Sequence, residues 1–404
     1  MVQDSWAPGQ FAGAAVIVST TVLDLPYGTA TLRATTRART TWVTAPGTGG
    51  PPPELNVMFR EALDGPVQSE PLDHRVRAGD RVTVILSDAT RDEPRREMLE
   101  AVRDRLPSVR LTLAIATGTH GRAGGLSAVG LDAAGLGDHA CVDHDGGQAL
   151  GLVHVGTTHR GTPVTVHRCI VEADLVIATG VIRPHYFAGW GAGAKAIFPG
   201  LAESGAARTN HRWKNHPSAR PGAVDDNECR LDLEEAARIA APRAFLLNGV
   251  ADSTGAVRTA VAGDICAAFR AGVVRARPWV TVRAAPGRFI VVADRPPVTR
   301  TLYQASKLVA AVAGLLLAGG TIVLVAPCEL GIGPTDVVNR AIYEIGLRPR
   351  LPAEHRIILV SDLPRALVET SYAVPAPSLD AAIDGAEELL VVPCASKLLL
   401  DAIG

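Results

Sequence analysis

The sequence predicts an α/β protein with two α/β domains, each built around a largely parallel sheet, and an active site in the interdomain cleft. At 404 residues the chain is longer than one compact core usually needs. Strand-like and helical runs alternate along it, an order typical of parallel sheets with right-handed crossovers. Hydrophobic residues make up 47% of the chain and charged residues 20%, as in ordinary globular proteins.

The first domain is predicted to span residues 1–277 and to begin with an antiparallel pair of strands around the turn at Tyr27 and Gly28. Hydrophobic periodicity then predicts strands at 81–86, 109–116, 174–178 and 244–247 and helices at 93–106, 231–240 and 260–271. The opening pair covers residues 14–20 and 29–34. Several prolines in the stretch 277–297 mark the domain boundary.

The second, smaller domain is predicted to span residues 278–404. It is expected to contain strands at 289–292, 321–325 and 356–360 and helices at 302–317 and 335–345. The apolar run 308–326 is long enough for a membrane span, but Gly319 and Gly320 interrupt it. We therefore expect a buried helix, a turn and a strand there, and no membrane segment.

Charge and composition limit the partners of the chain. A net charge of −1 and the lack of an Lys/Arg-rich run argue against a nucleic-acid partner. The six cysteines form no C-x-x-C pair, so reduced thiols are expected. The N-terminus shows no secretion signal, which predicts a cytoplasmic protein. A homodimer is compatible with the sequence.

Lysine is scarce in this chain. Of the 40 basic residues, 36 are arginines and four are lysines, namely Lys195, Lys214, Lys307 and Lys397. An amine can become neutral and nucleophilic, whereas a guanidinium stays protonated. We therefore weigh Lys195 and Lys307 as functional residues and interpret the other two as surface residues.

Polar residues follow three predicted strands. They form the segments 87–91 (Ser-Asp-Ala-Thr-Arg), 117–120 (Thr-Gly-Thr-His) and 180–185 (Gly-Val-Ile-Arg-Pro-His). Each segment alone is typical of a turn or helix cap. Because ligands of open parallel sheets bind beyond the carboxyl ends of the strands, three such segments together favour a binding site.

The third segment continues into a glycine-rich loop, 186–200, which contains Lys195. Its glycines would let backbone amides approach a phosphate closely. A Walker loop is excluded because Ala194 and Ala196 flank Lys195, and the glycine spacing does not fit a dinucleotide fingerprint. His211 follows Lys195 by sixteen residues, within reach of the same loop.

The other histidines are interpreted as packed or surface residues. These are His74, His139, His144, His154, His159, His167, His216 and His355. The run Asp143-His144-Asp145 is expected to be a polar loop.

Taken together, these segments resemble the nickel-pincer, lactate racemase-like proteins. The matching motifs are Asp88-Ala-Thr-Arg91, Gly118-Thr-His120, Pro184-His185 with Lys195 ten residues later, Pro199-Gly200, Asn210-His211 and Tyr303-Gln-Ala-Ser-Lys307. They occur in the family's order and span most of the chain.

The resemblance implies a racemase or epimerase of a 2-hydroxy acid that acts by hydride abstraction and return through a 2-keto intermediate. It implies a nickel-pincer nucleotide, made by cofactor-synthesis proteins, in which a modified nicotinic acid mononucleotide holds nickel through carbon and two sulfurs. By position, Lys195 matches the residue that joins this cofactor through a thioamide, and His211 matches the protein ligand of nickel.

The remaining site residues follow from the same resemblance. His120 and His185 match the two acid/base histidines, and Arg91, Tyr303 and Lys307 match substrate-binding positions. Further cofactor-binding residues are expected at Asp88, Thr90, Gly191 and Gly193. The chemistry is reasonable because histidines titrate near neutral pH, arginine can bind a carboxylate in bidentate fashion, and soft, square-planar donors suit nickel.

Two other functions stay open. One is a zinc or iron hydrolase that uses His120, His185 and His211 as metal ligands, although it leaves Lys195 unexplained. The other is a non-catalytic carrier of the nickel nucleotide, which would not need two bases.

The sequence departs from the family pattern in two places. The glycine loop reads Gly191-Ala192-Gly193 where the family usually has Ser-Gly-Gly, and Gly121 separates His120 from Arg122. No specificity residue can be assigned in 348–364 or 393–397, so the sequence does not identify the 2-hydroxy acid.

Overall fold

The computed structural model describes residues 15–17, 22–45, 48, 50–119, 121–132, 136–333 and 340–403. The chain forms two compact units, one of Gly49–Ala276 and one that combines Met1–Thr48 with Arg277–Gly404. The sequence-based division had placed all of 1–277 in one domain. The difference arises because strand β4 (Arg39–Trp42) pairs in parallel with β20 (Glu388–Val392), a long-range contact that local patterns do not reveal.

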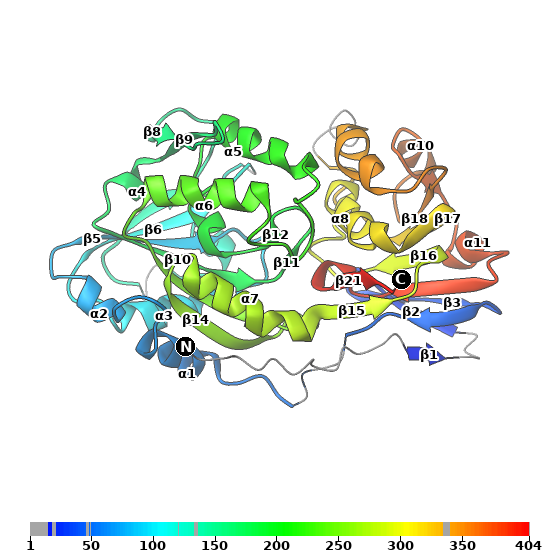
Figure 1. Ribbon diagram of the computed structural model, residues 1–404, viewed down its shortest axis with the longest axis horizontal. Coiled ribbons are helices and arrows are strands. Elements are labelled where there is room, and N and C mark those ends of the chain that lie inside the picture. The colour runs from blue at the N-terminus through cyan, green and yellow to red at the C-terminus, as the bar shows by residue number, and fades with distance from the viewer. Residues whose placement is uncertain are drawn as a thin grey trace. The chain divides into compact units, whose positions relative to one another are not determined.

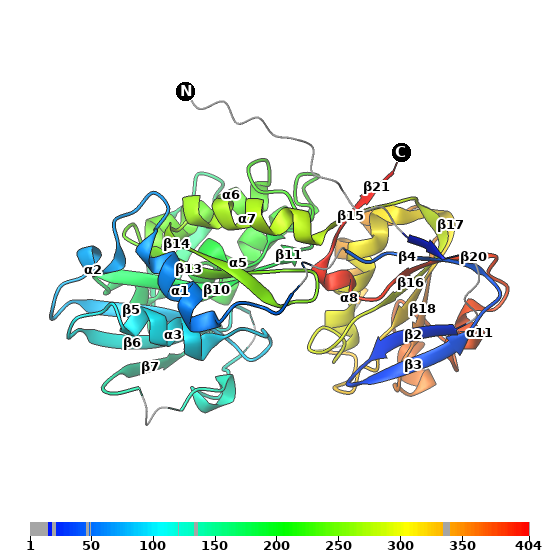
Figure 2. The same ribbon diagram turned by 90° about the horizontal axis from the view of Figure 1, so that it is seen from below.

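The unit of Gly49–Ala276 contains a six-stranded sheet in the order β14-β13-β10-β5-β6-β7 (Figures 1 and 2). Its strands are β5 (Arg81–Ser87), β6 (Arg110–Ala116), β7 (Ala140–Asp143), β10 (Leu175–Ile182), β13 (Phe245–Ala251) and β14 (Val257–Asp264). All neighbouring strands are parallel except β13 and β14. Every residue of the central strand β10 is buried, so the sheet is covered on both faces.

Helices cover the two faces of this sheet (Figure 2). Helices α1 (Leu55–Asp64) and α3 (Arg95–Arg103) pack on one face, and α7 (Ala267–Val280) packs on the other through Gly272. The remaining elements are α2 (Leu72–Arg75), hairpin β8–β9 (Leu152–Thr157 and Pro163–His167), α4 (Arg168–Val171), α5 (Ser204–His211) and α6 (Glu228–Ala240).

One predicted helix of this unit begins later than expected. Residues 260–271 were expected to be helical, but the chain continues as strand β14 to Asp264 and α7 begins at Ala267. The Asp264 carboxylate accepts the amide hydrogens of Cys266 and Ala267 at 3.0 and 2.9 Å and so marks the change. Pairing with β13 overrides the helical propensity of the alanines.

The other unit contains a seven-stranded sheet in the order β1-β4-β20-β16-β17-β18-β19, parallel except for the pair β1–β4. Its further strands are β1 (Ala15–Ile17), β16 (Gly287–Ala293), β17 (Leu316–Val325), β18 (Arg356–Val360) and β19 (Val374–Pro375). The described part of this unit also contains hairpin β2–β3 (Val22–Tyr27 and Ala30–Thr35), strands β15 (Thr281–Ala284) and β21 (Leu399–Ala402), and helices α8 (Leu302–Val312), α10 (Arg365–Val368) and α11 (Leu379–Ile383).

The expected α/β class with two largely parallel sheets is confirmed. The helix predicted at 302–317 is shorter, because α8 ends at Val312 and β17 starts at Leu316. Much of the helix predicted at 335–345 lies outside the described residues, and a π-helical turn occupies Ile342–Leu347. Among the helices of the described ranges, none combines the length and apolar character of a membrane span.

The segment after β10 turns sharply before it reaches Lys195. Pro184–His185 (β11) pairs with Gly189–Trp190 (β12), and a 3₁₀ turn, η3, covers Gly193–Ala196. Between them, Ala192 has φ 61° and ψ −159°, a backbone conformation that residues other than glycine rarely adopt. The Ala192 carbonyl accepts from the Arg230 guanidinium at 3.4 Å, and the next amide, of Gly193, donates to Asn248 Oδ1 at 2.9 Å. The surroundings therefore hold a strained residue in place.

Replacing Ala192 with glycine should stabilise the protein by about 1 kcal/mol, because the strained backbone is costly for alanine and not for glycine. Ala194→Gly is the matched control, since Ala194 is a buried residue of η3 that is absent from the positive-φ positions. The control should lose about 1 kcal/mol. Urea denaturation measures both changes, and an equal loss in the two variants would show that Ala192 carries no strain.

Candidate functional site

Lys195 lies on η3 and is half-buried. Its Nζ atom is 5.4 Å from the centroid of the Phe187 ring. The pKa of Lys195 is lowered to about 7, chiefly by burial; the positive charges of Arg230 and Arg91 act in the same direction, and Cys229 opposes them. Near neutral pH a large share of this amine is therefore unprotonated and nucleophilic.

His211 is the last residue of α5 and faces the same phenylalanine. Its ring centroid is 5.2 Å from that of Phe187, with the two rings nearly perpendicular. Burial lowers the pKa of His211 to about 3, and the charges of Lys195 and Lys214 contribute. Within the described ranges the imidazole makes no hydrogen bond. It is thus a neutral ring with a lone pair, the form in which histidine binds a metal.

His185 lies on β11, and its ring is 4.6 Å from Phe187 and stacks on Tyr186 at 5.2 Å. Its Nδ1 accepts the amide hydrogen of Ala188 at 3.2 Å and, at 3.5 Å, that of Phe187. Because Nδ1 accepts, the hydrogen of the neutral ring lies on Nε2. In this tautomer Nε2 can donate a proton to a reacting oxygen.

Phe187 is therefore the common neighbour of His185, Lys195 and His211, and sequence reasoning assigned it no role. It is 6% exposed, and Asn227, the N-cap of α6, donates from Nδ2 to its carbonyl at 2.8 Å. In the sequence, only its position between His185 and Lys195 could have indicated a role for Phe187. Three predicted site residues thus gather around one aromatic ring.

Asp88, Thr90 and Arg91 follow β5, as predicted. The Asp88 carboxylate is buried and accepts from the Thr90 amide at 2.9 Å and from the Thr90 hydroxyl. Arg95 Nε donates to the carbonyl of Ser87 at 2.8 Å and fixes the start of this turn. Thr90 and Arg91 are exposed, so Asp88 shapes a turn that presents the Arg91 guanidinium to solvent.

The backbone amides of the two loop glycines, Gly191 and Gly193, form hydrogen bonds within the protein. The amide of Gly191 donates to the carbonyl of Arg183 at 2.7 Å, and that of Gly193 is bonded to Asn248. Both amides are thus engaged within the protein and are not presented to a phosphate. A Cβ atom on Gly193 would lie 2.6 Å from the Phe269 ring, so close packing requires glycine there.

Three predicted site residues lie outside the described part of this unit. His120 lies outside the described residues, although nearby Gly118 donates from its amide to the Gly200 carbonyl at 2.9 Å. Tyr303 and Lys307 lie on α8 of the other unit, where Lys307 Nζ donates to Gln304 Oε1 at 2.5 Å. Their roles stay predictions.

The run Asp143-His144-Asp145 is not a simple polar loop, contrary to expectation. His144 is 1% exposed, and its Nε2 lies 2.9 Å from the Ala202 carbonyl. Burial lowers the pKa of His144. The Asp143 carboxylate accepts amide hydrogens from three successive residues, Ala123, Gly124 and Gly125. The run therefore ties together the segments on either side of it.

The amine of Lys195 should react with an acetylating reagent with a half-maximal rate near pH 7, because it loses its proton there. For an ordinary lysine the midpoint would lie at about pH 10.4. Peptide mass spectrometry can follow Lys195 directly, since the chain has only four lysines. Arg91→Ala should raise the midpoint because the Arg91 charge disfavours protonation. A midpoint near that of an ordinary lysine would contradict the assignment.

The same shift gives stability a pH dependence. Folding lowers the pKa of Lys195, so the unfolded chain binds a proton that the folded chain excludes. The destabilising effect of Lys195 is full below about pH 7 and declines as pH rises towards the ordinary lysine value of about 10.4. Lys195→Met should therefore stabilise the cofactor-free protein at about pH 6 more than at about pH 10. Urea midpoints at the two pH values measure this difference.

Comparison with known proteins finds similarity to lactate racemases. The sequence profile of the lactate racemase N-terminal domain matches residues 27–222. The lactate racemase of Thermoanaerobacterium thermosaccharolyticum is 28% identical over 369 residues, covering 82% of this chain and 86% of the relative. That of Lactiplantibacillus plantarum is 28% identical over 361 residues, covering 81% and 84%.

Solved structures agree with this grouping. The lactate racemase apoprotein from T. thermosaccharolyticum superposes with a TM-score of 0.81 at 25% identity, covering 94% of this chain and 100% of that one. A Thermotoga maritima protein shares the fold, with a TM-score of 0.64 at 17% identity and coverage of 88% and 99%. The profile, the relatives and the fold thus agree: residues 27–222 match the lactate racemase N-terminal domain, and most of the chain resembles lactate racemases, a type of isomerase, in sequence and fold.

Proposed function

We propose that this isomerase is a racemase or epimerase of a 2-hydroxy acid and that it works with a nickel-pincer nucleotide attached to Lys195. The observation that carries the proposal is the convergence of Lys195, His185 and His211 on the Phe187 ring. An amine with a pKa lowered to about 7 and a neutral imidazole, so close together, suit a covalently attached metal cofactor. Relatives named lactate racemases support the reaction type.

The described residues fit this cofactor. Lys195 would hold it through an amide-type bond, for which an amine must be unprotonated, as the lowered pKa of Lys195 allows. His211 would supply the protein donor to nickel, because its ring is neutral and makes no hydrogen bond within the described ranges. When bound, the cofactor supplies an acceptor for the hydride of the substrate.

The protein's own groups would handle the substrate's proton and charge. Arg91, exposed at the end of β5, would bind the substrate carboxylate in bidentate fashion. His185 would exchange the hydroxyl proton through Nε2, since Nδ1 is bonded to the backbone. We assign the second proton-transfer role to His120, and substrate contacts to Tyr303 and Lys307, from the family motifs that they match. A base on each side of the substrate suits a reaction that interconverts two configurations.

Intact-protein mass spectrometry and metal analysis test this proposal directly. After coexpression with cofactor-synthesis proteins, the chain should carry a thioamide-linked nucleotide and nickel, and Lys195→Arg should abolish both. Lys214→Arg is the matched control and should retain both. Chiral chromatography should then show interconversion of the enantiomers of at least one 2-hydroxy acid. A wild-type protein with neither adduct nor nickel, or one that is fully active with zinc after Lys195→Ala, would overturn the proposal.

His185→Asn should lower kcat by about 10²-fold to 10⁴-fold, the contribution typical of a general acid–base group. Asparagine keeps an acceptor for the Ala188 amide and so preserves the local turn. Nickel content and the Lys195 adduct should stay at wild-type levels. His216→Ala, at an exposed histidine bonded to Ser218, should leave kcat unchanged. Unchanged turnover in His185→Asn with cofactor bound would instead favour the carrier function.

A further inference from the structure

We propose that Asp232 is a positioning residue for His211 and acts through Asn210. This inference rests on the proposed function, because it assumes that His211 binds nickel. Asp232 lies on α6, and Asn210 precedes His211 in the last turn of α5. No described contact joins either side chain to the Phe187 ring or to the side chains of His185, Lys195 and His211 around it. Their effect on nickel binding would therefore be indirect.

The Asp232 carboxylate is fully buried and bonded by three neutral donors. Its Oδ1 accepts from the Thr158 hydroxyl at 2.5 Å, and its Oδ2 accepts from the Thr162 hydroxyl at 2.6 Å and from Asn210 Nδ2 at 2.8 Å. Within the described ranges no cationic side chain pairs with it. A buried carboxylate without a cation persists only where such bonds replace its hydration. These three hydrogen bonds therefore fix the orientations of Thr158, Thr162 and Asn210 relative to Asp232.

Asn210 is equally buried, and both polar atoms of its side chain are bonded to α6. Besides the bond to Asp232, Nδ2 donates to the Cys229 carbonyl at 3.1 Å, and Oδ1 accepts from the Cys229 thiol at 3.5 Å. These bonds fix the last turn of α5 against rotation about its own axis. Because His211 is the next residue, its direction is fixed by the same bonds.

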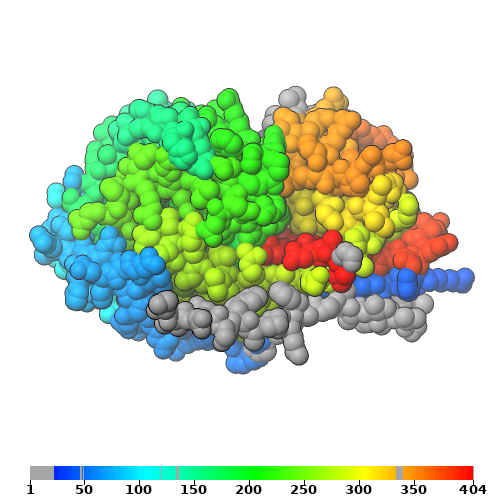
Figure 3. All heavy atoms as spheres, in the orientation of Figure 1, coloured from blue at the N-terminus to red at the C-terminus, as the bar shows by residue number. Residues whose placement is uncertain are grey.

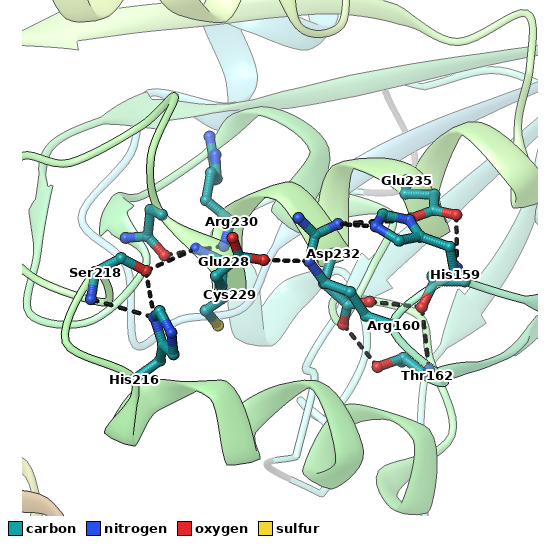
Figure 4. A network of polar contacts seen from close by, with 12 residues as sticks. His159, Arg160, Thr162, His216, Ser218, Glu228, Cys229, Arg230, Asp232 and Glu235 are labelled. Atoms are coloured by element: carbon teal, nitrogen blue, oxygen red, sulfur yellow. Dashed lines mark hydrogen bonds and ion pairs between the residues drawn. The ribbon is translucent and has the colours of Figure 1, made fainter.

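The opposite side of Asp232 is closed by the tip of hairpin β8–β9. Arg160 pairs with Glu228, and His159 pairs with Glu235, next to the bond between Thr162 and Asp232 (Figure 4). In the orientation of Figure 3, the hairpin and helices α5 and α6 form part of the near surface of this unit. Asp232 is thus held from the hairpin while it holds α5.

Asp232→Ala should weaken the attachment of nickel and leave the nucleotide attached. In the cofactor-loaded protein, nickel per chain should fall about 10-fold to 100-fold, as expected when support of a metal-ligating histidine is lost. The visible absorption of the nickel that remains should shift. The Lys195 adduct mass should persist, because η3 makes no bond to Asp232. Asn210→Ala, which leaves the threonine bonds in place, should give the same pattern.

Two further variants separate positioning from general stability. Asp232→Asn should restore nickel content and absorption, because its amide oxygen can still accept from Asn210 while its amide nitrogen donates to a threonine hydroxyl. Thr162→Val removes one bond to the same carboxylate oxygen but none to α5. It should lower the urea midpoint and leave nickel content unchanged.

Wild-type nickel content and absorption in both Asp232→Ala and Asn210→Ala would overturn the inference. Equal loss of nickel in Thr162→Val and Asp232→Ala would also overturn it, since a purely structural role would then account for both. A wild-type protein that carries neither adduct nor nickel would overturn the proposed function itself, and this result is distinct from the other two.

Discussion

The site depends on the polar side chains that the first turns of α6 bury. Asn227, Arg230 and Asp232 are each completely inaccessible to solvent. A buried polar group costs free energy unless a partner replaces its hydration, so each of the three must be bonded. Each finds its partner outside α6, respectively the Phe187 carbonyl, the Ala192 carbonyl and the Asn210 amide. The start of α6 thereby fixes two points of the loop 186–200 and the last turn of α5, whose positions local sequence alone would leave independent.

The buried charge of Arg230 affects the protonation of Lys195. Its Nε atom pairs with Glu234 at 2.9 Å, and its guanidinium lies 3.7 Å from the centroid of the Phe269 ring. Glu234 also pairs with Arg270 at 3.0 Å. The carboxylate is thus shared between two guanidiniums, and Arg230 still lowers the pKa of Lys195. The positive charge of Arg91 also acts on Lys195. The surroundings of Lys195 therefore favour anionic groups such as carboxylate and phosphate.

Sequence reasoning succeeded where the relevant information is local. The polar segment after β5, the histidine of β11 and the lysine of η3 could be found because strand ends and residue scarcity are visible in the sequence. Phe187, Arg230 and Asp232 could not be found, because their importance lies in contacts between distant segments. The same limit explains the helix predicted at 260–271, where long-range pairing with β13 continues the strand to Asp264. In the opening strand pair, the turn at Tyr27 and Gly28 and the strand after it agree with the prediction, whereas the strand before the turn covers Val22–Tyr27 and not 14–20.

The strained backbone at Ala192 and the buried Arg230 side chain depend on each other. A Cβ atom on Gly193 would lie 2.6 Å from the Phe269 ring and 3.0 Å from an Arg230 nitrogen, so close packing of the loop against these two side chains favours glycine at that position. That close approach brings the Ala192 carbonyl within 3.4 Å of the same guanidinium and forces Ala192 into its unusual conformation. Because η3 starts directly after this turn, the strain is localised next to Lys195. The backbone conformation next to Lys195 therefore depends on the contact between Ala192 and Arg230 of α6, and not on the glycines of the loop alone.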